Sequence, residues 1–316
     1  MDTIELKGQS FKHCYLNEDN MQDLAHLFLE IYGTKTEISF LKEKYMVDHI
    51  EMDCFGCLMY NQNDVPVGFQ GAVPYRLEYK GKEFIGAQSC DSMTHPSYQG
   101  MGIFGFLAQR VDELLKAQGV KCIYGFPNQN SAKIFFSKLD WIQSGTMYHY
   151  GIATGSFPFG KILMRLGFLK SVYKRWRDGV ISRQGKIITG LANSEQNMNS
   201  VTVVHDRAFF DYKRNALVLK MKNGTVWLSP GAQILIGDFE VENREMLVGL
   251  LEELKRLARK IGVTQLSFQC QQGGINQQML ESITPGTSTW EIGGKSFDME
   301  LSPESLLLTY GDLDTF

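Results

Sequence analysis

The order of hydrophobic and polar positions in the first half of the chain predicts alternating strands and helices. Apolar residues recur every three or four positions in several segments, which is typical of helices with one buried face. Short, almost continuous apolar runs between these segments indicate buried strands. The predicted helices cover residues 21–32, 38–45, 103–118 and 131–139, and the predicted strands cover residues 10–17, 54–60, 65–94 (a pair joined at 80–82) and 120–126. We therefore expect a mixed α/β domain over residues 1–152.

The last third of the chain repeats this order. Strands are predicted over residues 201–206, 216–221, 225–241 and 263–270, and a helix over residues 244–261. Between the halves, "SFPFGKILMRLGFLKSVYKRWR" (156–177) mixes apolar and basic residues. This pattern fits a helix on a membrane surface, or a linking helix packed across two lobes with solvated lysines, which we expect. We predict a linking region at 153–200 and a second lobe at 201–316.

Composition narrows the classes of partner. The chain has 316 residues, 43% of them hydrophobic, and a formal net charge of −3, which does not indicate binding to nucleic acid. No run approaches about 20 apolar residues, so we expect no stable membrane insertion and a cytoplasmic protein. In that compartment we expect the six cysteines to be reduced thiols. Cys54 and Cys57 have a metal-like spacing but no second pair, so we expect core packing and no metal.

A glycine-rich turn, "SYQGMGIFG" (97–105), stands between a predicted strand and a predicted helix. Such a turn leaves the first N–H groups of the helix open and makes an anion site, whereas tight packing is the alternative explanation. The run also spells G-x-G-x-x-G. A Rossmann site would need an acidic residue about 20 positions later, and the region offers Cys122, Tyr124 and Asn128 instead.

The residues on both sides of this turn resemble the signatures of a known protein family. "MTHPSYQGMGIF" (93–104) and "PNQNSAKIFFSKLDW" (127–141) resemble, at the expected separation, the two signatures of the GNAT superfamily of acyl-coenzyme A-dependent N-acyltransferases. The second is especially similar to the two-lobed, enhanced-intracellular-survival-type acetyltransferases. The resemblance covers residues 10–152 and implies a central, mixed, splayed sheet. Because "GDFEVENREM" (237–246) has no glycine turn, the second lobe reads as a degenerate GNAT-like copy that binds no cofactor.

The resemblance implies acetyl-coenzyme A as co-substrate and places it on named positions. Backbone N–H groups of the turn should hold the pyrophosphate: Gln99, Gly100, Met101, Gly102, Ile103 and Phe104. Main-chain groups of Ser92, Met93 and Thr94 should hold the pantetheine arm like an added strand. Asn130 matches a position whose side chain touches that arm, and a helix N-cap is the equal alternative.

The catalytic groups follow the family pattern less closely. Many relatives place a Tyr that protonates the departing thiolate where this chain has Phe136, and a phenyl ring has no proton to give. Tyr124, Tyr148, Tyr150 or water can replace it; otherwise the protein binds acyl-coenzyme A without turnover. A second departure is Asp140, where the family has a glycine that tolerates positive φ.

The acceptor amine must lose a proton before it attacks a thioester. Asp91 and His95 are the nearest ionisable candidates for the base, and each also has a purely structural explanation. In certain relatives the terminal carboxylate enters the acceptor site, which Phe316 could imitate if the tail is not frayed.

These features predict an N-acyltransferase that moves acetyl to a primary amine of a small molecule such as an amino sugar. The alternatives are a protein or peptide amine as acceptor, a non-catalytic acyl-coenzyme A-binding module, and a tRNA-dependent aminoacyl transferase. The near-neutral charge and the intact turn argue against the last. The oligomeric state stays open.

Overall fold

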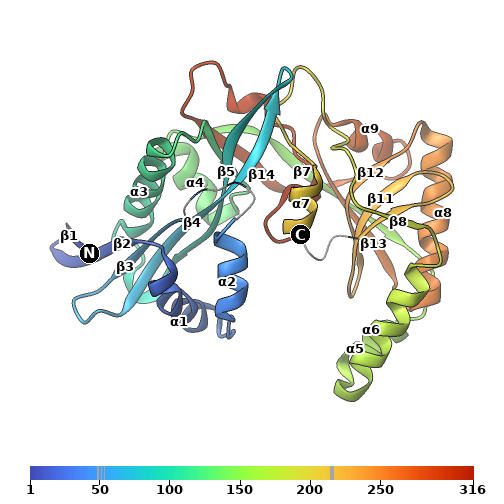
Figure 1. Cartoon of the computed structure of the whole chain (residues 1–316), viewed down its shortest axis with the longest axis horizontal. Helices are drawn as coiled ribbons and strands as arrows, with labels where there is room; N and C mark the ends of the chain where they lie inside the picture. The colour runs from blue at the N-terminus through green and yellow to red at the C-terminus, as the bar shows by residue number, and fades with distance from the viewer. Residues whose placement is uncertain (48–49, 51, 53, 214–216) are drawn as a thin grey trace. The chain divides into compact units, whose positions relative to one another are not determined.

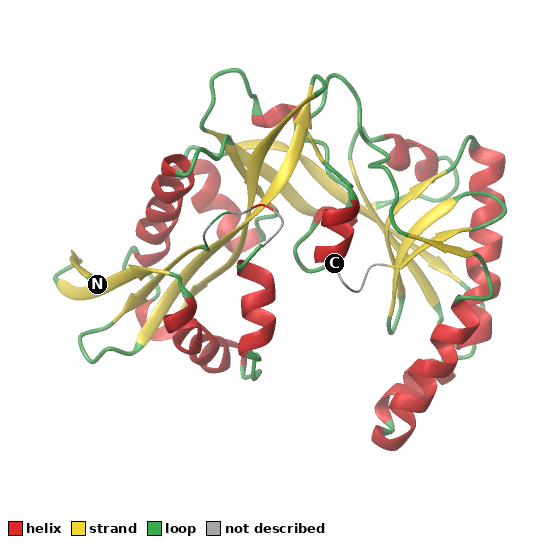
Figure 2. Ribbon diagram, in the orientation of Figure 1, coloured by secondary structure: helices red, strands yellow, loops and turns green. Residues whose placement is uncertain are grey.

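The computed structural model of the chain describes residues 1–47, 50, 52, 54–213 and 217–316, and these form two compact units (Figure 1). The first unit comprises residues 1–144 and 291–306, and the second comprises residues 145–290 and 307–316. Both are mixed α/β units built on largely antiparallel sheets (Figure 2). The expected fold class is confirmed.

The sheet of the first unit has the strand order β1-β2-β3-β4-β5-β6-β14. Its neighbours pair antiparallel except β5 and β6, which run parallel with α3 between them. The bounds are β1 Asp2–Leu6, β2 Gln9–Tyr15, α1 Met21–Tyr32, α2 Ile38–Tyr45, β3 Phe55–Tyr60, β4 Pro66–Tyr79, β5 Lys82–Thr94, α3 Ile103–Ala117, β6 Cys122–Gly125, α4 Gln129–Lys138 and β14 Thr287–Ser296.

Helices cover both faces of this sheet. Neighbouring residues of a strand point to opposite faces. On β4, Phe69 packs edge-on against Tyr45 of α2 at 5.6 Å, while Gly68 lies directly under Ile103 of α3. The helices α2 and α3 therefore lie on opposite faces of the sheet. Phe135 of α4 joins the core on the α3 side.

The second unit repeats this plan with the order β7-β13-β12-β11-β10-β8. Among its described strands, β12 and β13 pair parallel, and α8 again connects the two parallel strands. The bounds are β7 Ile142–Ala153, α5 Phe159–Arg165, α6 Gly167–Ile181, β8 Lys186–Ile188, β9 Thr202–Val203, α7 Arg207–Tyr212, β10 Leu217–Lys220, β11 Thr225–Pro230, β12 Ile234–Glu240, α8 Arg244–Ile261, β13 Gln265–Gln271 and α9 Ile275–Glu281.

The two halves of the chain exchange one strand. The strand that follows α4 is β7, and its residues 147–153 pair antiparallel with β13 in the second unit. The strand that follows α9 is β14, and its residues 293–296 pair antiparallel with β6 in the first unit. An ion pair anchors this end of β14, because Lys295 Nζ lies 3.1 Å from Asp112 Oδ2 of α3 and both side chains are largely buried.

This exchange gives domain bounds that differ from those expected from the sequence. The sequence suggested 1–152, a linking region at 153–200, and 201–316. The structure divides the chain after Ser144, assigns residues 153–200 to the second unit, and returns residues 291–306 to the first. The physical reason is strand pairing between segments distant in sequence, which local patterns do not record.

Most local predictions are confirmed, including the helices beginning at 38, 103 and 244 and the turn at Lys80 and Gly81, both with positive φ. The predicted helix at 156–177 is two helices, because the extended backbone of Leu166 separates α5 from α6. The sequence missed β1, β8, α7, α9 and β14. The predicted strand 216–221 begins at Ala216, which lies outside the described residues; β10 starts at Leu217.

The C-terminal residues pack in the second unit rather than fraying. The Phe316 ring lies edge-on against Trp227 of β11 and against Tyr310, with 5.0 Å between ring centroids in each case. The predicted entry of its carboxylate into an acceptor site stays a prediction.

The core of the second unit depends on α8. Leu254 is fully buried on this helix, whereas Val248 is 41% exposed. Removing buried methyl groups costs transfer free energy and leaves a cavity. We predict that Leu254→Ala lowers the free energy of unfolding by about 2–5 kcal/mol in urea denaturation followed by circular dichroism. Val248→Ala serves as the matched control, and an equal loss for both variants would contradict the described burial.

Candidate functional site

The turn before α3 adopts the conformation that the sequence predicted. After a short 3-10 turn at Pro96–Tyr98, Gly100 and Gly102 have φ of +77° and +91°. Helix α3 then starts at Ile103, with Gly102 as its N-cap and no side chain capping its amides. A Cβ atom on either glycine would meet nothing within 4 Å, so the backbone conformation, and not crowding, requires glycine here.

This turn leaves backbone donors available. Among the hydrogen bonds of the described residues, none uses the N–H groups of Gly100, Gly102, Ile103 or Phe104. Four such donors, together with the positive end of a 15-residue helix, favour an anion with several oxygens. The turn therefore has the geometry of a phosphate or pyrophosphate site.

The strand that leads into the turn has a free edge. β5 pairs with β6 only from Gly86 opposite Cys122 to Gln88 opposite Tyr124. Beyond Gln88, β5 continues to Thr94, and no strand of the described part of the chain pairs with its β6-facing edge. Residues 92–94 lie in this stretch. Their main-chain groups can pair with an extended ligand as a strand would.

Asp91 lies in a β-bulge of β5, where the regular pairing with β4 is interrupted. The register between β4 and β5 shifts between Phe69 and Gly71, and Asp91 has φ of +48°, which is unusual for a non-glycine residue. Its Oδ2 accepts hydrogen bonds from Lys44 Nζ at 2.7 Å and from Tyr45 Oη at 2.6 Å. Backbone strain of this kind concentrates at functional sites.

The electrostatics of this cluster keep the Tyr45 phenol protonated. Burial, and then the negative charge of Asp91, raise the pKa of Tyr45 well above its usual value of about 10. Lys44 is itself buried, and its charge is paired with Asp91. Because both donors use Oδ2, the Oδ1 atom of Asp91 accepts no hydrogen bond from the described residues. Asp91 is thus oriented, with one oxygen left to take a proton.

The other predicted catalytic side chains have structural roles. His95 caps the 3-10 turn, since its Nδ1 accepts the N–H of Ser97 at 3.3 Å. Tyr124 is fully buried in β6. Tyr148 and Tyr150 lie on β7 in the second unit, where Tyr150 Oη donates to Glu281 at 2.7 Å. Burial and this hydrogen bond raise the pKa of Tyr150, which makes it a poorer acid.

Helix α4 begins with a cap that the sequence analysis assigned elsewhere. The Asn128 Oδ1 atom accepts the N–H of Ser131 at 3.1 Å. Asn130 lies in the first turn of α4, and its side chain is outside the described residues, so its contact with the cofactor stays a prediction. Asp140, after this helix, has φ of +57°, which confirms the expected positive φ.

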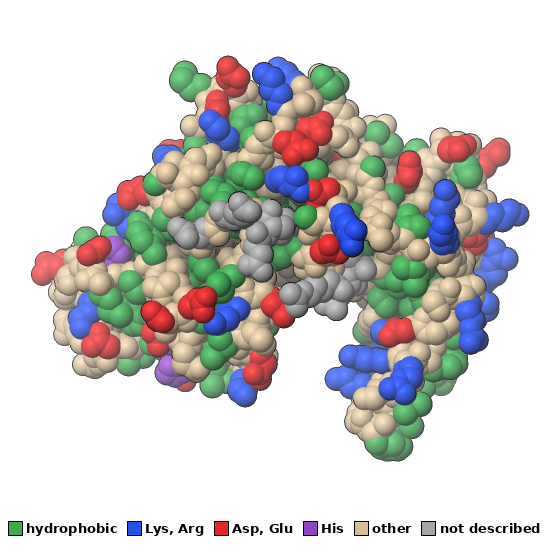
Figure 3. Space-filling model, in the orientation of Figure 1, with side chains coloured by type: hydrophobic (Ala, Val, Ile, Leu, Met, Phe, Trp, Pro, Cys, Tyr) green, Lys and Arg blue, Asp and Glu red, His purple; other side chains and the backbone are tan. Residues whose placement is uncertain are grey.

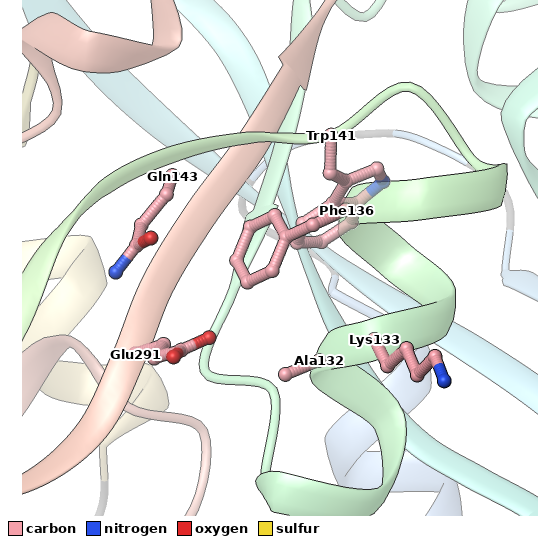
Figure 4. Close-up of a pocket in the computed structure, with 6 residues that line it drawn as sticks. All are labelled: Ala132, Lys133, Phe136, Trp141, Gln143 and Glu291. Carbon is pink, nitrogen blue, oxygen red and sulfur yellow. The ribbon is translucent and has the colours of Figure 1, made fainter.

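Phe136 projects from α4 into an open cavity of about 470 Å³ in the first unit (Figure 4). The cavity is lined by Ala132, Lys133, Phe136, Trp141, Gln143 and Glu291. Glu291 comes from the exchanged strand β14 and brings a carboxylate to a wall otherwise formed by α4 and the start of β7. No sequence signal linked Glu291 to Phe136, because the two residues meet only through the strand exchange.

The matching helix of the second unit is closed to anions. The side chain of Asn243 caps α8 by accepting the N–H of Met246 at 3.0 Å. Glu242 and Glu245 flank the cap, and their charges oppose an anion. The two units thus share a topology but differ at this helix start.

The described residues give no sign of a metal centre. Within these ranges, no three His, Cys, Asp or Glu side chains are grouped to hold a metal ion. None of the six cysteines forms a disulfide, and Cys57 is buried in β3. Burial raises the pKa of the Cys57 thiol to about 12, which makes it unreactive.

Comparisons with known proteins agree with this geometry. The family model of the acetyltransferase (GNAT) domain matches residues 14–142. A putative acetyltransferase from Pyrococcus horikoshii is similar in structure, with a TM-score of 0.58, 14% identity, and coverage of 99% of this chain and 97% of that one. A GCN5-related N-acetyltransferase from Kribbella flavida has a TM-score of 0.57 and 11% identity, with 92% of this chain and 72% of that one covered.

A third similar structure is a region of a fungal multi-domain enzyme described as a glucosamine N-acetyltransferase. It has a TM-score of 0.53 and 13% identity, and the match covers 91% of this chain and 38% of that one. At these identities the structural matches show the fold alone. A comparison with curated proteins found no match. The resemblance to the enhanced-intracellular-survival-type branch stays a prediction.

The family model and the structural matches agree on the segment that contains the glycine turn, the bulged strand and α4. Residues 14–142 of the chain therefore match a GNAT acetyltransferase domain, and the fold of the chain is similar to that of GCN5-related N-acetyltransferases.

Proposed function

We propose that the protein transfers an acetyl group from acetyl-coenzyme A to a primary amine of a small molecule such as an amino sugar. The observation that carries this proposal is the uncapped start of α3, where Gly100 and Gly102 leave backbone donors open beside the free edge of β5. A pyrophosphate with an extended amide-containing arm fits both features at once.

Within this proposal the open N–H groups of Gly100, Gly102, Ile103 and Phe104 hold the pyrophosphate, and the main chain of residues 92–94 pairs with the pantetheine arm. The predicted N–H groups of Gln99 and Met101 instead donate to the carbonyls of Pro96 and Tyr98 within the turn. The co-substrate supplies a thioester carbon that is open to attack by an amine. We assign Asn130 a contact with the arm because it lies in the first turn of α4. Six cysteines that form no disulfide suit the reducing cytoplasm, in which we place the reaction.

We assign the role of general base to Asp91. Its Oδ1 takes one proton from the acceptor ammonium, and the nitrogen lone pair then attacks the thioester carbon. The attacking nitrogen gives a second proton to water as the carbon–sulfur bond breaks, which leaves the amide and the thiolate. Lys44 and Tyr45 hold this carboxylate in one orientation by donating to Oδ2. His95 and Tyr124 are weaker candidates, because one caps a turn and the other is fully buried.

The departing thiolate needs no protein acid in this mechanism. Phe136 lines the cavity with a ring that carries no proton. Thiols have pKa values near 8.5, so a thiolate is a tolerable leaving group at neutral pH and takes its proton from water. Phe136 instead gives the cavity an apolar wall, opposite the polar side chains of Gln143 and Glu291 (Figure 4).

Two observations favour an amino sugar as the acceptor. A similar fold occurs in the fungal region described as a glucosamine N-acetyltransferase, which favours an amino sugar. The Glu291 carboxylate and the Gln143 amide can bind an ammonium and hydroxyl groups. Amines of proteins or peptides are the alternative acceptors.

A second function, a non-catalytic acyl-coenzyme A-binding module, is favoured by one observation, the absence of a phenol at Phe136. Steady-state release of free thiol from acetyl-coenzyme A separates the two functions. We expect release that depends on an added amine, tested with amino sugars, amino acids, polyamines and a lysine peptide. Tight acetyl-coenzyme A binding without amine-dependent release would leave only the binding module.

The role of Asp91 is tested by Asp91→Asn, which keeps the shape and tolerates positive φ. We predict that kcat/KM for the amine falls about 100-fold or more, while the Kd for acetyl-coenzyme A changes little. Asp140→Asn is the matched control, since Asp140 also has positive φ, at +57°. Equal activities of the two variants would remove Asp91 from the mechanism.

The role of the turn is tested by the double variant Gly100→Val with Gly102→Val. A β-branched residue is strained at these φ values and moves the backbone donors, so we predict that the Kd for coenzyme A rises at least about tenfold in calorimetry. Gly81→Val is the matched control, because Gly81 has φ of +72° and equally open surroundings but lies in the β4–β5 turn. A folded double variant with unchanged affinity would refute the pyrophosphate site.

A further inference from the structure

Helices α5 and α6 of the second unit form an exposed arm, which we define as residues 157–181. The arm is attached through one face of α6, where Tyr173, Arg177 and Ile181 recur at intervals of four residues and are buried. Tyr173 Oη donates to the carbonyl of Ile261 at 2.6 Å, and Arg177 Nη1 donates to that of Pro230 at 2.8 Å. These contacts hold the arm on the end of α8 and on β11.

A second stripe on α6 is apolar and open to solvent. Phe168, Val172 and Trp176 also recur at intervals of four residues, one position before the buried stripe, and are 81%, 65% and 46% exposed. A shift of one residue rotates a stripe by about 100° around a helix, so the two stripes face different directions. Phe157, Ile162 and Leu166 extend the exposed apolar surface toward α5. Soluble surfaces seldom gather large apolar side chains in this way.

The same arm is basic and lacks acidic residues over most of its length. Residues 157–177 contain no Asp or Glu. The exposed basic side chains are Lys161, Arg165, Lys170, Lys174 and Arg175. Figure 3 shows Lys and Arg side chains gathered on the arm, with apolar ones at its end. Arg177 is excluded from this set, because it is buried and pairs with Asp178.

We propose that this arm docks on the surface of an anionic phospholipid bilayer. An exposed apolar stripe flanked by lysines and arginines, with no acidic residue between them, matches the apolar boundary and the negative headgroups of such a surface together. The exposed rings of Phe168 and Trp176 enter the interfacial region, and the basic side chains bind headgroup phosphates. None of the described helices has the length and apolar character needed to cross a bilayer, so docking here means attachment to the surface.

The test is cosedimentation of the full chain with phospholipid vesicles in 0.1 M salt. We expect binding to vesicles of phosphatidylcholine with one quarter phosphatidylglycerol, and at least about tenfold weaker binding to phosphatidylcholine alone. Raising the salt to 0.5 M should weaken the binding, since exposed charges are screened. Equal binding to both vesicles, or none to either, would overturn the proposal.

Two variants of the arm and two matched controls assign the binding to this surface. Phe168→Ser with Val172→Ser removes apolar contact, and Lys170→Glu with Lys174→Glu reverses charge; each should weaken binding at least about tenfold. Leu29→Ser with Phe40→Ser and Lys80→Glu with Lys82→Glu make the same changes at exposed positions of the first unit and should leave binding unchanged.

Two other partners, a second copy of the chain and nucleic acid, would give different results with the same variants. If the apolar stripe instead binds a second copy of the chain, sedimentation velocity will show a dimer that the Phe168→Ser and Val172→Ser variant loses, and anionic vesicles will not sediment the protein. If the basic residues instead bind nucleic acid, a DNA duplex will bind the full chain, and anionic vesicles will not sediment it. Either result would overturn the membrane proposal. All variants keep the acyltransferase site unchanged, so failure here is independent of the proposed function.

Discussion

The proposed ligand binding in the first unit depends on the start of α3, where no side chain caps the backbone N–H groups. Unpaired backbone N–H groups cost stability when they are shielded from water, and at the start of α8 the side chain of Asn243 pairs with one of them. Helix α3 keeps its donors open because Gly100 and Gly102 turn the chain into the helix at positive φ without bringing a capping side chain. This local difference separates a unit that can hold a diphosphate from its structural repeat.

Strand β5 connects the start of α3 to the proposed base, because it carries both the free edge and Asp91. Separation of β5 from β6 beyond Gln88 gives the free edge along which an extended arm can pair. The bulge at Asp91 then turns a carboxylate out of the same strand, and Lys44 and Tyr45 of α2 orient it from the opposite face to α3. One strand thus carries both the binding edge and the proposed base.

The sequence predicted those parts of the site that are formed by residues close together in the chain. The turn at 97–105, the helix starting at 103 and the family resemblance all depend on neighbouring residues, and each is confirmed. Sequence could not reveal that Lys44 pairs with Asp91, because a fold must first bring positions 47 residues apart together. Glu291 was missed for the same reason, since the pairing of β14 with β6 is the product of a strand exchange between the two halves.

The most direct measurement of the central claim is backbone amide hydrogen exchange with and without saturating acetyl-coenzyme A. If N–H groups at the start of α3 bind the diphosphate, exchange at Gly100, Gly102, Ile103 and Phe104 should slow at least about tenfold. Exchange at the start of α8, where Asn243 already caps the helix, should not change. Unchanged exchange at the four residues of the turn, in protein shown to be saturated with the thioester, would contradict the account.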